Sequence, residues 1–262
     1  QSDALPVVLI PGRGVDIGTA YIAAGQMHDD NANMSQAAIR DCFITLPADE
    51  ASNLMMGGVD FRMSEDEEHC IVVGDAAIEL AAIHAIPLRR PLAQGFISDK
   101  EDLGKEVVNI ILGQLLGNPQ PRGELAVYSV PGPILGESGT RAQYHTRFFG
   151  DRLKDLGFTP MPINEAAAVV YSDTERQARV LAAMSETERS KHTAASGLGI
   201  SFGAGMINVA LVHRGLLVRA FSLPFGGDFI DESAAKATNT PVAQVTLRKE
   251  EGLDLNHNRR AG

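Results

Sequence analysis

Two glycine-rich turns, each between apolar strand-like runs, most constrain how this chain can fold. The first is Asp16-Ile17-Gly18-Thr19-Ala20, and the second covers residues 201–208 (Ser-Phe-Gly-Ala-Gly-Met-Ile-Asn). Glycine lets a backbone come close to a ligand, and successive N–H groups in such a turn can bind phosphate oxygens. Each turn alone is more typical of a plain β-hairpin. Two turns of one plan in one chain favour a phosphate clamp that takes one turn from each side.

Runs typical of strands and of helices alternate along most of the 262 residues. Helical spacing of apolar residues and stop signals predict helices at 76–84, 99–116, 138–156, 164–171 and 226–238. Short apolar runs predict strands at 69–73, 124–130, 159–162, 197–211 and 216–223, with a turn inside the fourth. Residues 36–46 are compatible with a strand or a short helix. The alternation predicts an α/β fold.

The glycine turns also divide the chain into two halves of related design. We expect a first domain at 1–172 with a small inserted subdomain near 30–100, and part of a second domain at 195–262. The polar segment 173–196 is expected to join them along the surface. After the helix that begins near Gly226 we expect a polar tail from Thr246 without further strands, so the second domain is expected to be incomplete.

Bulk composition excludes several classes of function. The net charge is −10 and the pI is near 5.2, which disfavours nucleic acid as a partner. No apolar run is long enough for a transmembrane segment, and the first residues do not have the pattern of a signal peptide. Cys42 and Cys70 have no metal-ligand spacing and are expected to be reduced. These observations predict a cytoplasmic protein.

One competing motif is a hydrolase signature. Residues 199–203 read Gly-Ile-Ser-Phe-Gly, the G-x-S-x-G pattern of a nucleophile elbow. That elbow requires a helix after the serine, whereas residues 206–212 form a β-branched apolar run typical of a strand. No histidine pair in the sequence has metal-ligand spacing. The glycine-turn interpretation is therefore preferred.

Five segments in order resemble the actin/Hsp70/sugar-kinase superfamily. The two glycine turns are similar to its phosphate loops. Residues 72–77 are similar to a segment shared by bacterial actins and Hsp70, residues 162–168 to the helix start that joins the two halves, and residues 224–231 to the Gly-Gly-Asp/Glu segment after the second phosphate loop. Within the superfamily the chain is most similar to bacterial and archaeal actin homologues of the MreB, MamK and ParM type. The matching segments are residues 15–20, 72–77, 162–168, 200–209 and 224–231.

The resemblance implies an actin-like (ribonuclease H-like) two-domain ATPase fold that binds ATP and Mg²⁺. It implies that Asp16 positions the metal and that Glu165 polarises the attacking water, so these two are the candidate catalytic residues. It also implies self-association into filaments, with adaptor proteins left unspecified. The implied nucleotide-binding residues are Gly18, Thr19, Ala20, Ser201, Gly203, Ala204, Gly205, Gly226 and Gly227.

Three departures from the superfamily pattern keep alternative functions open. Ser201 occupies the position of the usual aspartate of the second phosphate loop, and Asn208 stands where an acid is common. Ile78 stands where the Hsp70 branch has a catalytic lysine. The leading hypothesis is a polymerising ATPase. The alternatives are an Hsp70-like chaperone ATPase and a non-hydrolysing nucleotide-binding scaffold of the cell-division or pilus-assembly type.

Overall fold

The computed structural model describes residues 12–27, 34–84, 86–120, 122–181, 195–250 and 252. Its largest element is a mixed sheet of five strands, here called the first sheet, in the order β10-β9-β1-β2-β3. Strand β1 pairs in parallel with β9 and antiparallel with β2. The strands are β1 (Arg13–Ile17), β2 (Tyr21–Met27), β3 (Met34–Arg40), β9 (Leu125–Val130) and β10 (Thr159–Asn164).

Alternation along β1 determines which face of the first sheet carries the core. Val15 and Ile17 are buried, whereas Gly14 and Asp16 are exposed. Successive side chains of a strand point to opposite faces, so Val15 and Ile17 join the apolar core with α3 (Gly104–Leu116) and α4 (Thr140–Asp155). The side chain of Asp16 therefore lies on the face opposite those helices.

Residues 36–46, compatible with a strand or a short helix from their sequence, belong to two strands. β3 pairs with β2 along its whole length. After a break at Asp41, β4 (Phe43–Pro47) begins and belongs to a separate small sheet. β4 pairs with β6 (His69–Val73), which also pairs with β5 (Arg62–Met63). Pairing with neighbouring strands, rather than local propensity, decides the conformation here.

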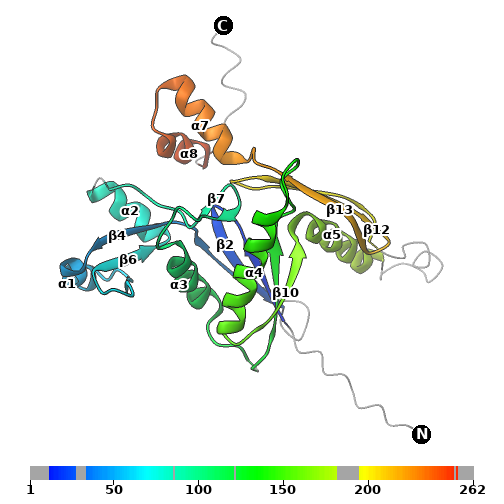
Figure 1. Ribbon diagram of the computed structural model, residues 1–262, viewed down its shortest axis with the longest axis horizontal. Coiled ribbons are helices and arrows are strands. Elements are labelled where there is room, and N and C mark those ends of the chain that lie inside the picture. The colour runs from blue at the N-terminus through cyan, green and yellow to red at the C-terminus, as the bar shows by residue number, and fades with distance from the viewer. Residues whose placement is uncertain are drawn as a thin grey trace.

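The sheet β4-β6-β5 forms a small unit with its own apolar cluster. Two helices complete it, α1 (Ala51–Met56), preceded by a 3-10 turn at Ala48–Glu50, and α2 (Asp75–His84). Figure 1 shows this unit at one end of the molecule, beyond α3. A tight hairpin of β7 (Leu92–Ala93) and β8 (Phe96–Ile97) follows in the chain.

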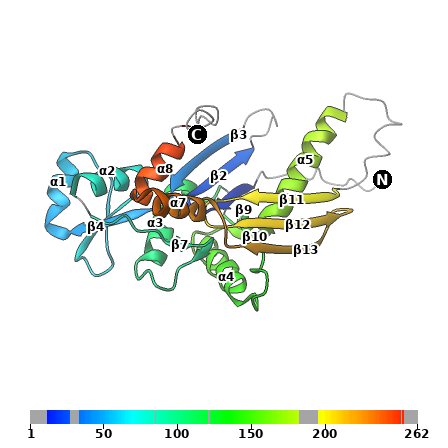
Figure 2. The same ribbon diagram turned by 90° about the horizontal axis from the view of Figure 1, so that it is seen from above.

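Three antiparallel strands form the second sheet, in the order β11-β12-β13. They are β11 (Gly197–Phe202), β12 (Ile207–His213) and β13 (Leu216–Leu223). Helix α5 (Glu165–Leu181) packs along this sheet, as Figure 2 shows from above. A Cβ atom at Gly199 would lie 1.9 Å from the carbonyl oxygen of Ala166. Glycine at 199 is therefore required for this close approach of α5 to β11.

Two helices follow the second sheet, α7 (Gly227–Thr238) and α8 (Val242–Glu250). The prediction of one helix followed by a polar tail from Thr246 is wrong as far as Glu250, because α8 is a second helix. The nearly buried carboxylate of Asp231 on α7 accepts hydrogen bonds from Thr246 and Lys249, both at 2.8 Å. These tertiary contacts stabilise a helix whose own apolar pattern is short. The tail residues 253–262 lie outside the described residues.

Helix α5 is also longer than predicted, since it continues to Leu181 instead of ending near residue 171. Residues 182–194 of the predicted joining segment lie outside the described residues. The predicted domain boundaries at 1–172, 30–100 and 195–262 remain predictions, as does the incomplete second domain. Within the described residues, no helix combines the length and apolarity needed to cross a membrane.

Buried His145 in α4 predicts a specific pH dependence of stability. Its Nδ1 accepts a hydrogen bond from the backbone N–H of Ile97 at 3.2 Å, and burial lowers its pKa from 6.5 to about 3. The folded state therefore holds this ring neutral while the unfolded state takes up a proton below pH 6.5. Stability is full above that pH and falls as the pH drops toward 3, by about 1.4 kcal/mol per pH unit.

The measurement is urea unfolding between pH 7.5 and 4 for the wild type and the His145→Gln variant. The variant is expected to lose part of the acid slope. His213→Gln, at an exposed position of β12, is the control and is expected to keep it. Equal slopes for His145→Gln and the wild type would contradict the assignment.

Candidate functional site

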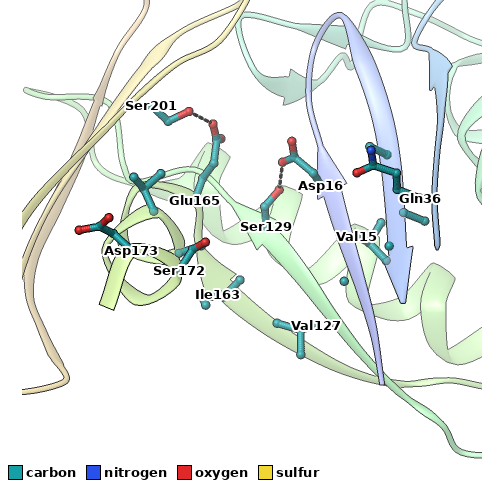
Figure 3. Close-up of a pocket in the computed structure, with 16 residues that line it drawn as sticks. Val15, Asp16, Gln36, Val127, Ser129, Ile163, Glu165, Ser172, Asp173 and Ser201 are labelled. Carbon is teal, nitrogen blue, oxygen red and sulfur yellow. Dashed lines mark hydrogen bonds between the residues drawn. The ribbon is translucent and has the colours of Figure 1, made fainter. Parts of the chain in front are cut away.

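A cavity of about 730 Å³ lies between the exposed face of the first sheet and α5. Its walls are largely apolar, and three polar side chains that the sequence singles out line it together: Asp16, Glu165 and Ser201. Figure 3 shows Asp16 on the strand β1 side, facing Glu165 and Ser201 across the cavity. Ligand cavities typically combine an apolar wall with a few convergent polar groups.

Asp16 is held in place by Ser129 of β9. The hydroxyl of Ser129 donates to Oδ1 of Asp16 at 2.8 Å (Figure 3). It also accepts the backbone N–H of Ile17 at 2.8 Å. The parallel pairing of β1 with β9 brings these residues together from positions 113 apart in the chain. The orientation of the Asp16 carboxylate is therefore fixed before any ligand arrives.

Glu165 is the first residue of α5, and Asn164 caps this helix. Oδ1 of Asn164 accepts the backbone N–H of Ala167 at 3.1 Å, which is the bonding of an N-cap. Ser201 Oγ donates to Oε1 of Glu165 at 2.5 Å, and Asn208 Nδ2 donates to Oε2 at 2.8 Å. Both carboxylate oxygens of Glu165 therefore accept hydrogen bonds from the second sheet.

The pKa of Glu165 is raised above its ordinary value. Burial is the largest cause, and the negative charge of Asp16 acts in the same direction. The hydrogen bonds from Ser201 and Asn208 oppose the rise because they stabilise the charged form. A carboxylate with a raised pKa in a cavity is suited to accept a proton near neutral pH.

The two glycine turns lie against each other. A Cβ atom at Gly205 would lie 2.4 Å from Oγ1 of Thr19 and 2.5 Å from the backbone nitrogen of Gly95. Thr19 is only 5% exposed. The structure thus brings the predicted pair of turns together, in direct contact, with the β7–β8 hairpin beside them.

The segment after β13 fixes the second turn from behind. The backbone N–H of Gly227 donates to the carbonyl of Gly203 at 3.0 Å, and that of Asp228 donates to the carbonyl of Ala204 at 2.8 Å. A Cβ atom at Gly226 would lie 2.3 Å from the oxygen of Ala204. The predicted residues Gly226 and Gly227 therefore contact the backbone of the second turn.

The predicted residues do not all share one cavity. Of these residues, Asp16, Glu165 and Ser201 line the cavity of Figure 3. Thr19 and Gly205 form the contact between the two turns. Gly203, Ala204, Gly226 and Gly227 contact one another around the second turn. Gly18 and Ala20 belong to the first turn, where the N–H of Gly18 donates to the carbonyl of Tyr21 at 3.0 Å and the carbonyl of Ala20 accepts the N–H of Asp41 at 2.9 Å.

Two cationic residues near the second turn are not singled out by the sequence. Arg90 Nη1 bonds both carboxylate oxygens of Asp228, at 3.1 and 3.0 Å, and so ties the segment before β7 to the start of α7. Nζ of Lys249 lies 3.4 Å from the place a Cβ at Gly227 would take. Lys249 has no sequence signal because α8 is not predicted, and pairs such as Arg90–Asp228 have no local signature.

The sequence also does not predict the contacts that two neutral residues of the site make. Asn208 stands out in the sequence only as a departure from a pattern, and Ser129 has no sequence signal. Both lie on strands whose pairing places them beside a carboxylate.

The competing hydrolase motif is excluded by the position of its serine. Ser201 lies within β11 and pairs antiparallel with Asn208, so no helix follows it. Gly199 of that motif serves the close approach of α5. Cys42 and Cys70 are buried free thiols.

Comparison with solved structures identifies the fold. The structure is similar to that of MamK in a double helical filament, with a TM-score of 0.61, 18% sequence identity, and coverage of 93% of this chain and 66% of that chain. It is similar to MreB5 of Spiroplasma citri bound to ADP, with a TM-score of 0.54, 17% identity, and coverage of 87% and 56%. The structure of MreB5 bound to AMPPNP gives a TM-score of 0.53 at 16% identity. The chain has an actin-like α/β fold, which confirms the predicted fold class.

The family assignment follows from the sequence match. The volactin family pattern matches residues 12–262, which is nearly the whole chain, and the chain belongs to the volactin family. Comparison with the curated proteins gave no match. The chain spans 66% of the MamK chain and 56% of the MreB5 chain.

The contact of the two turns predicts that Gly205→Ala destabilises the protein. The added methyl group would meet the backbone of Gly95 and the side chain of Thr19, and overpacking of this kind costs about 1–3 kcal/mol. The measurement is the midpoint of urea unfolding. Gly113→Ala is the control, because a Cβ there meets nothing within 4 Å and the residue lies inside α3. That variant is expected to be stabilised by about 0.5–1 kcal/mol. A Gly205→Ala protein as stable as the wild type would show that the turns do not touch.

Proposed function

We propose that this protein binds ATP with Mg²⁺ between its two glycine turns, hydrolyses it slowly, and assembles into filaments under the control of the bound nucleotide. The observation that carries the proposal is the meeting of the Thr19 turn with the Gly205 turn beside Asp16 and Glu165. A clamp of this kind has one backbone loop on each side of a polyphosphate.

The chemistry of both turns fits phosphate. Glycines at 203 and 205 allow close approach of the backbone, and Thr19 adds a hydroxyl donor. The ammonium group of Lys249 lies next to Gly227 but is paired with the carboxylate of Asp231 at 2.8 Å, so the phosphate contacts are proposed for the backbone of the turns and for Thr19. Because the turns are in contact in this structure, binding of a polyphosphate between them requires that they separate.

Asp16 fits the role of a magnesium-positioning residue. It is an exposed carboxylate whose orientation Ser129 fixes, and Mg²⁺ prefers carboxylate oxygens and keeps several waters. Magnesium bound with ATP would neutralise the charge that develops on the transferred phosphoryl group. Residue 201 is a serine and offers no carboxylate. Asp16 and Glu165 are therefore the two predicted site residues in this cavity that are acidic.

Glu165 fits the role of the group that orients and polarises water. Its raised pKa favours proton acceptance, and it lies in the same cavity as Asp16. Ser201 and Asn208 each occupy one of its oxygens, but a carboxylate has about four acceptor sites in all. Capacity for a water molecule therefore remains.

Filament formation is proposed from the fold and from the assemblies and ligands described for similar structures. MamK is described in a double helical filament, and MreB5 has been seen with ADP and with AMPPNP. Those properties belong to MamK and MreB5, and at under 20% identity the likeness shows the fold alone. The clamp between two sheets is the physical reason for extending them to this protein.

One observation favours a second candidate function, a nucleotide-binding scaffold without turnover. Ser201 replaces an acid near the metal position, and its hydroxyl is engaged by Glu165. A site with fewer carboxylates could bind nucleotide and leave the phosphate bond intact.

Phosphate release from Mg²⁺-ATP tests the main proposal. Glu165→Ala is expected to lower the rate by about 10²-fold or more, the usual contribution of general-base catalysis, while nucleotide binding persists. Glu79→Ala, within α2 of the small unit and away from the cavity, is the control and should leave the rate unchanged. Binding without release in the wild type would support the scaffold instead, and release that Glu165→Ala leaves unchanged would contradict the role of Glu165.

Sedimentation tests the assembly part of the proposal. The protein is expected to pellet at high concentration with Mg²⁺-ATP and to remain in the supernatant without nucleotide. The Arg90→Ala variant, which loses the link to Asp228, is expected to pellet less because the segment before β7 is less firmly tied to the start of α7. Pelleting that does not depend on nucleotide would contradict nucleotide control of assembly.

A further inference from the structure

A chain of buried polar side chains leads from β13 to Glu165. Ser222 of β13 is fully buried, and its hydroxyl lies 2.5 Å from Oδ1 of Asn208. Asn208 of β12 is 1% exposed, and its Nδ2 donates to Oε2 of Glu165 at 2.8 Å. Both buried members of this chain thus have hydrogen-bond partners, as buried polar groups require.

The direction of the Asn208 amide follows from its two neighbours. If the amide were turned over, its carbonyl oxygen would face a carboxylate oxygen of Glu165 at 2.8 Å, and two acceptors would repel each other. In the observed orientation the amide donates to Glu165 and accepts from Ser222. The hydroxyl of Ser222 has a second acceptor within reach, the carbonyl of Gly132 at 3.0 Å.

Ser222, at the far end of this series of hydrogen bonds, contacts the segment that follows β9. The backbone N–H of Ser222 donates to the carbonyl of Pro133 at 2.9 Å, and Leu135 donates to the carbonyl of Ser222 at 3.0 Å. A Cβ atom at Gly132 would lie 2.9 Å from the backbone of Phe221. Ser222 therefore ties β13 of the second sheet to residues 132–135, which follow β9 of the first sheet.

Ser201 of β11 is the second donor to the carboxylate of Glu165. It holds Oε1 of Glu165 while Asn208 holds Oε2, so two neutral donors from neighbouring strands grip one carboxylate. An acid at either position would bring a second negative charge within hydrogen-bond distance of Glu165, which favours protonation of one of the pair. Serine at 201 and asparagine at 208 are therefore matched to a charged Glu165.

We propose that Asn208 and Ser222 are positioning residues that, with Ser201, hold the Glu165 carboxylate in one orientation toward the cavity. The inference rests on the proposed function only for its effect on turnover. It also gives one explanation for the two departures from the superfamily pattern, because the residues at 201 and 208 are both neutral donors to Glu165. Through the contacts of Ser222, the orientation of Glu165 depends on how closely the two sheets approach.

The first test is Asn208→Asp, which keeps the shape and replaces the donor by a carboxylate oxygen. Phosphate release is expected to fall by about tenfold to a hundredfold, the loss typical when a group that orients a functional ligand is removed. Nucleotide affinity is expected to change by less than about twofold, because the buried side chain of Asn208 faces Glu165 and not the glycines of the turn. An equal loss of affinity and turnover would indicate a merely structural role and overturn the proposal.

The pH profile of the same variant is a second readout. The groups that face Glu165 are Asp16 from β1, Ser201 from β11 and the carboxyl that the substitution introduces on β12, and Asp173 on α5 lines the same cavity. At lower pH either Glu165 or the introduced carboxyl is protonated, and the protonated group can donate to the other. The deficit of the variant is therefore expected to shrink as the pH falls, and a deficit independent of pH would overturn the proposal.

Ser222→Ala tests the middle of the chain. It removes the donor to Asn208 and is expected to lower turnover less than Asn208→Asp, with affinity unchanged. Ser233→Ala is the matched control, because that hydroxyl donates to the carbonyl of Phe229 within α7, away from Glu165. Identical turnover in Ser222→Ala and the wild type would show that Ser222 is not a positioning residue.

Nuclear magnetic resonance separates failure of this inference from failure of the proposed function. If the wild type releases no phosphate, the exchange of the Asn208 side-chain amide protons with solvent still reports the hydrogen bonds. Slow exchange in the wild type that becomes fast in Ser222→Ala and Glu165→Ala supports the chain. Fast exchange already in the wild type would overturn the inference whatever the protein does with ATP.

Discussion

The site depends on the close approach of α5 to strand β11. Residue 199 must be glycine, since a Cβ there would lie 1.9 Å from the carbonyl oxygen of Ala166. This approach places the first residue of α5 beside the two strands that supply its donors, so Glu165 reaches both Ser201 and Asn208. A larger residue at 199 would move the helix and release the carboxylate that the cavity presents.

Close backbone contacts recur wherever the two sheets meet. Gly205 lies against Thr19 and Gly95, and Gly132 lies against Phe221. Tightly packed surfaces of this kind transmit displacement instead of absorbing it. Any displacement of the second sheet relative to the first would also change the contacts of Ser222, which is linked through Asn208 to Glu165.

Much of the fold could be predicted because its signals are local. Both glycine turns, the strands that flank them and helices α3 and α4 have clear patterns in the sequence. Helix α8 could not be predicted because its stability comes from the contacts of Thr246 and Lys249 with buried Asp231 on α7. The strands within 36–46 could not be told from a helix, since their pairing with β2 and β6 decides their conformation.

The sequence by itself determined the residue types that the site has: an aspartate at 16 beside the first turn, glycines at both turns, a glutamate at 165, a serine at 201 and an asparagine at 208. Composition and spacing are properties of the chain, so they can be read without coordinates. Only the tertiary structure decided that Ser201 and Asn208 bind the same carboxylate and that Ser129 holds Asp16. Those contacts join residues 36 to 113 positions apart, and their geometry is set by strand pairing and helix packing.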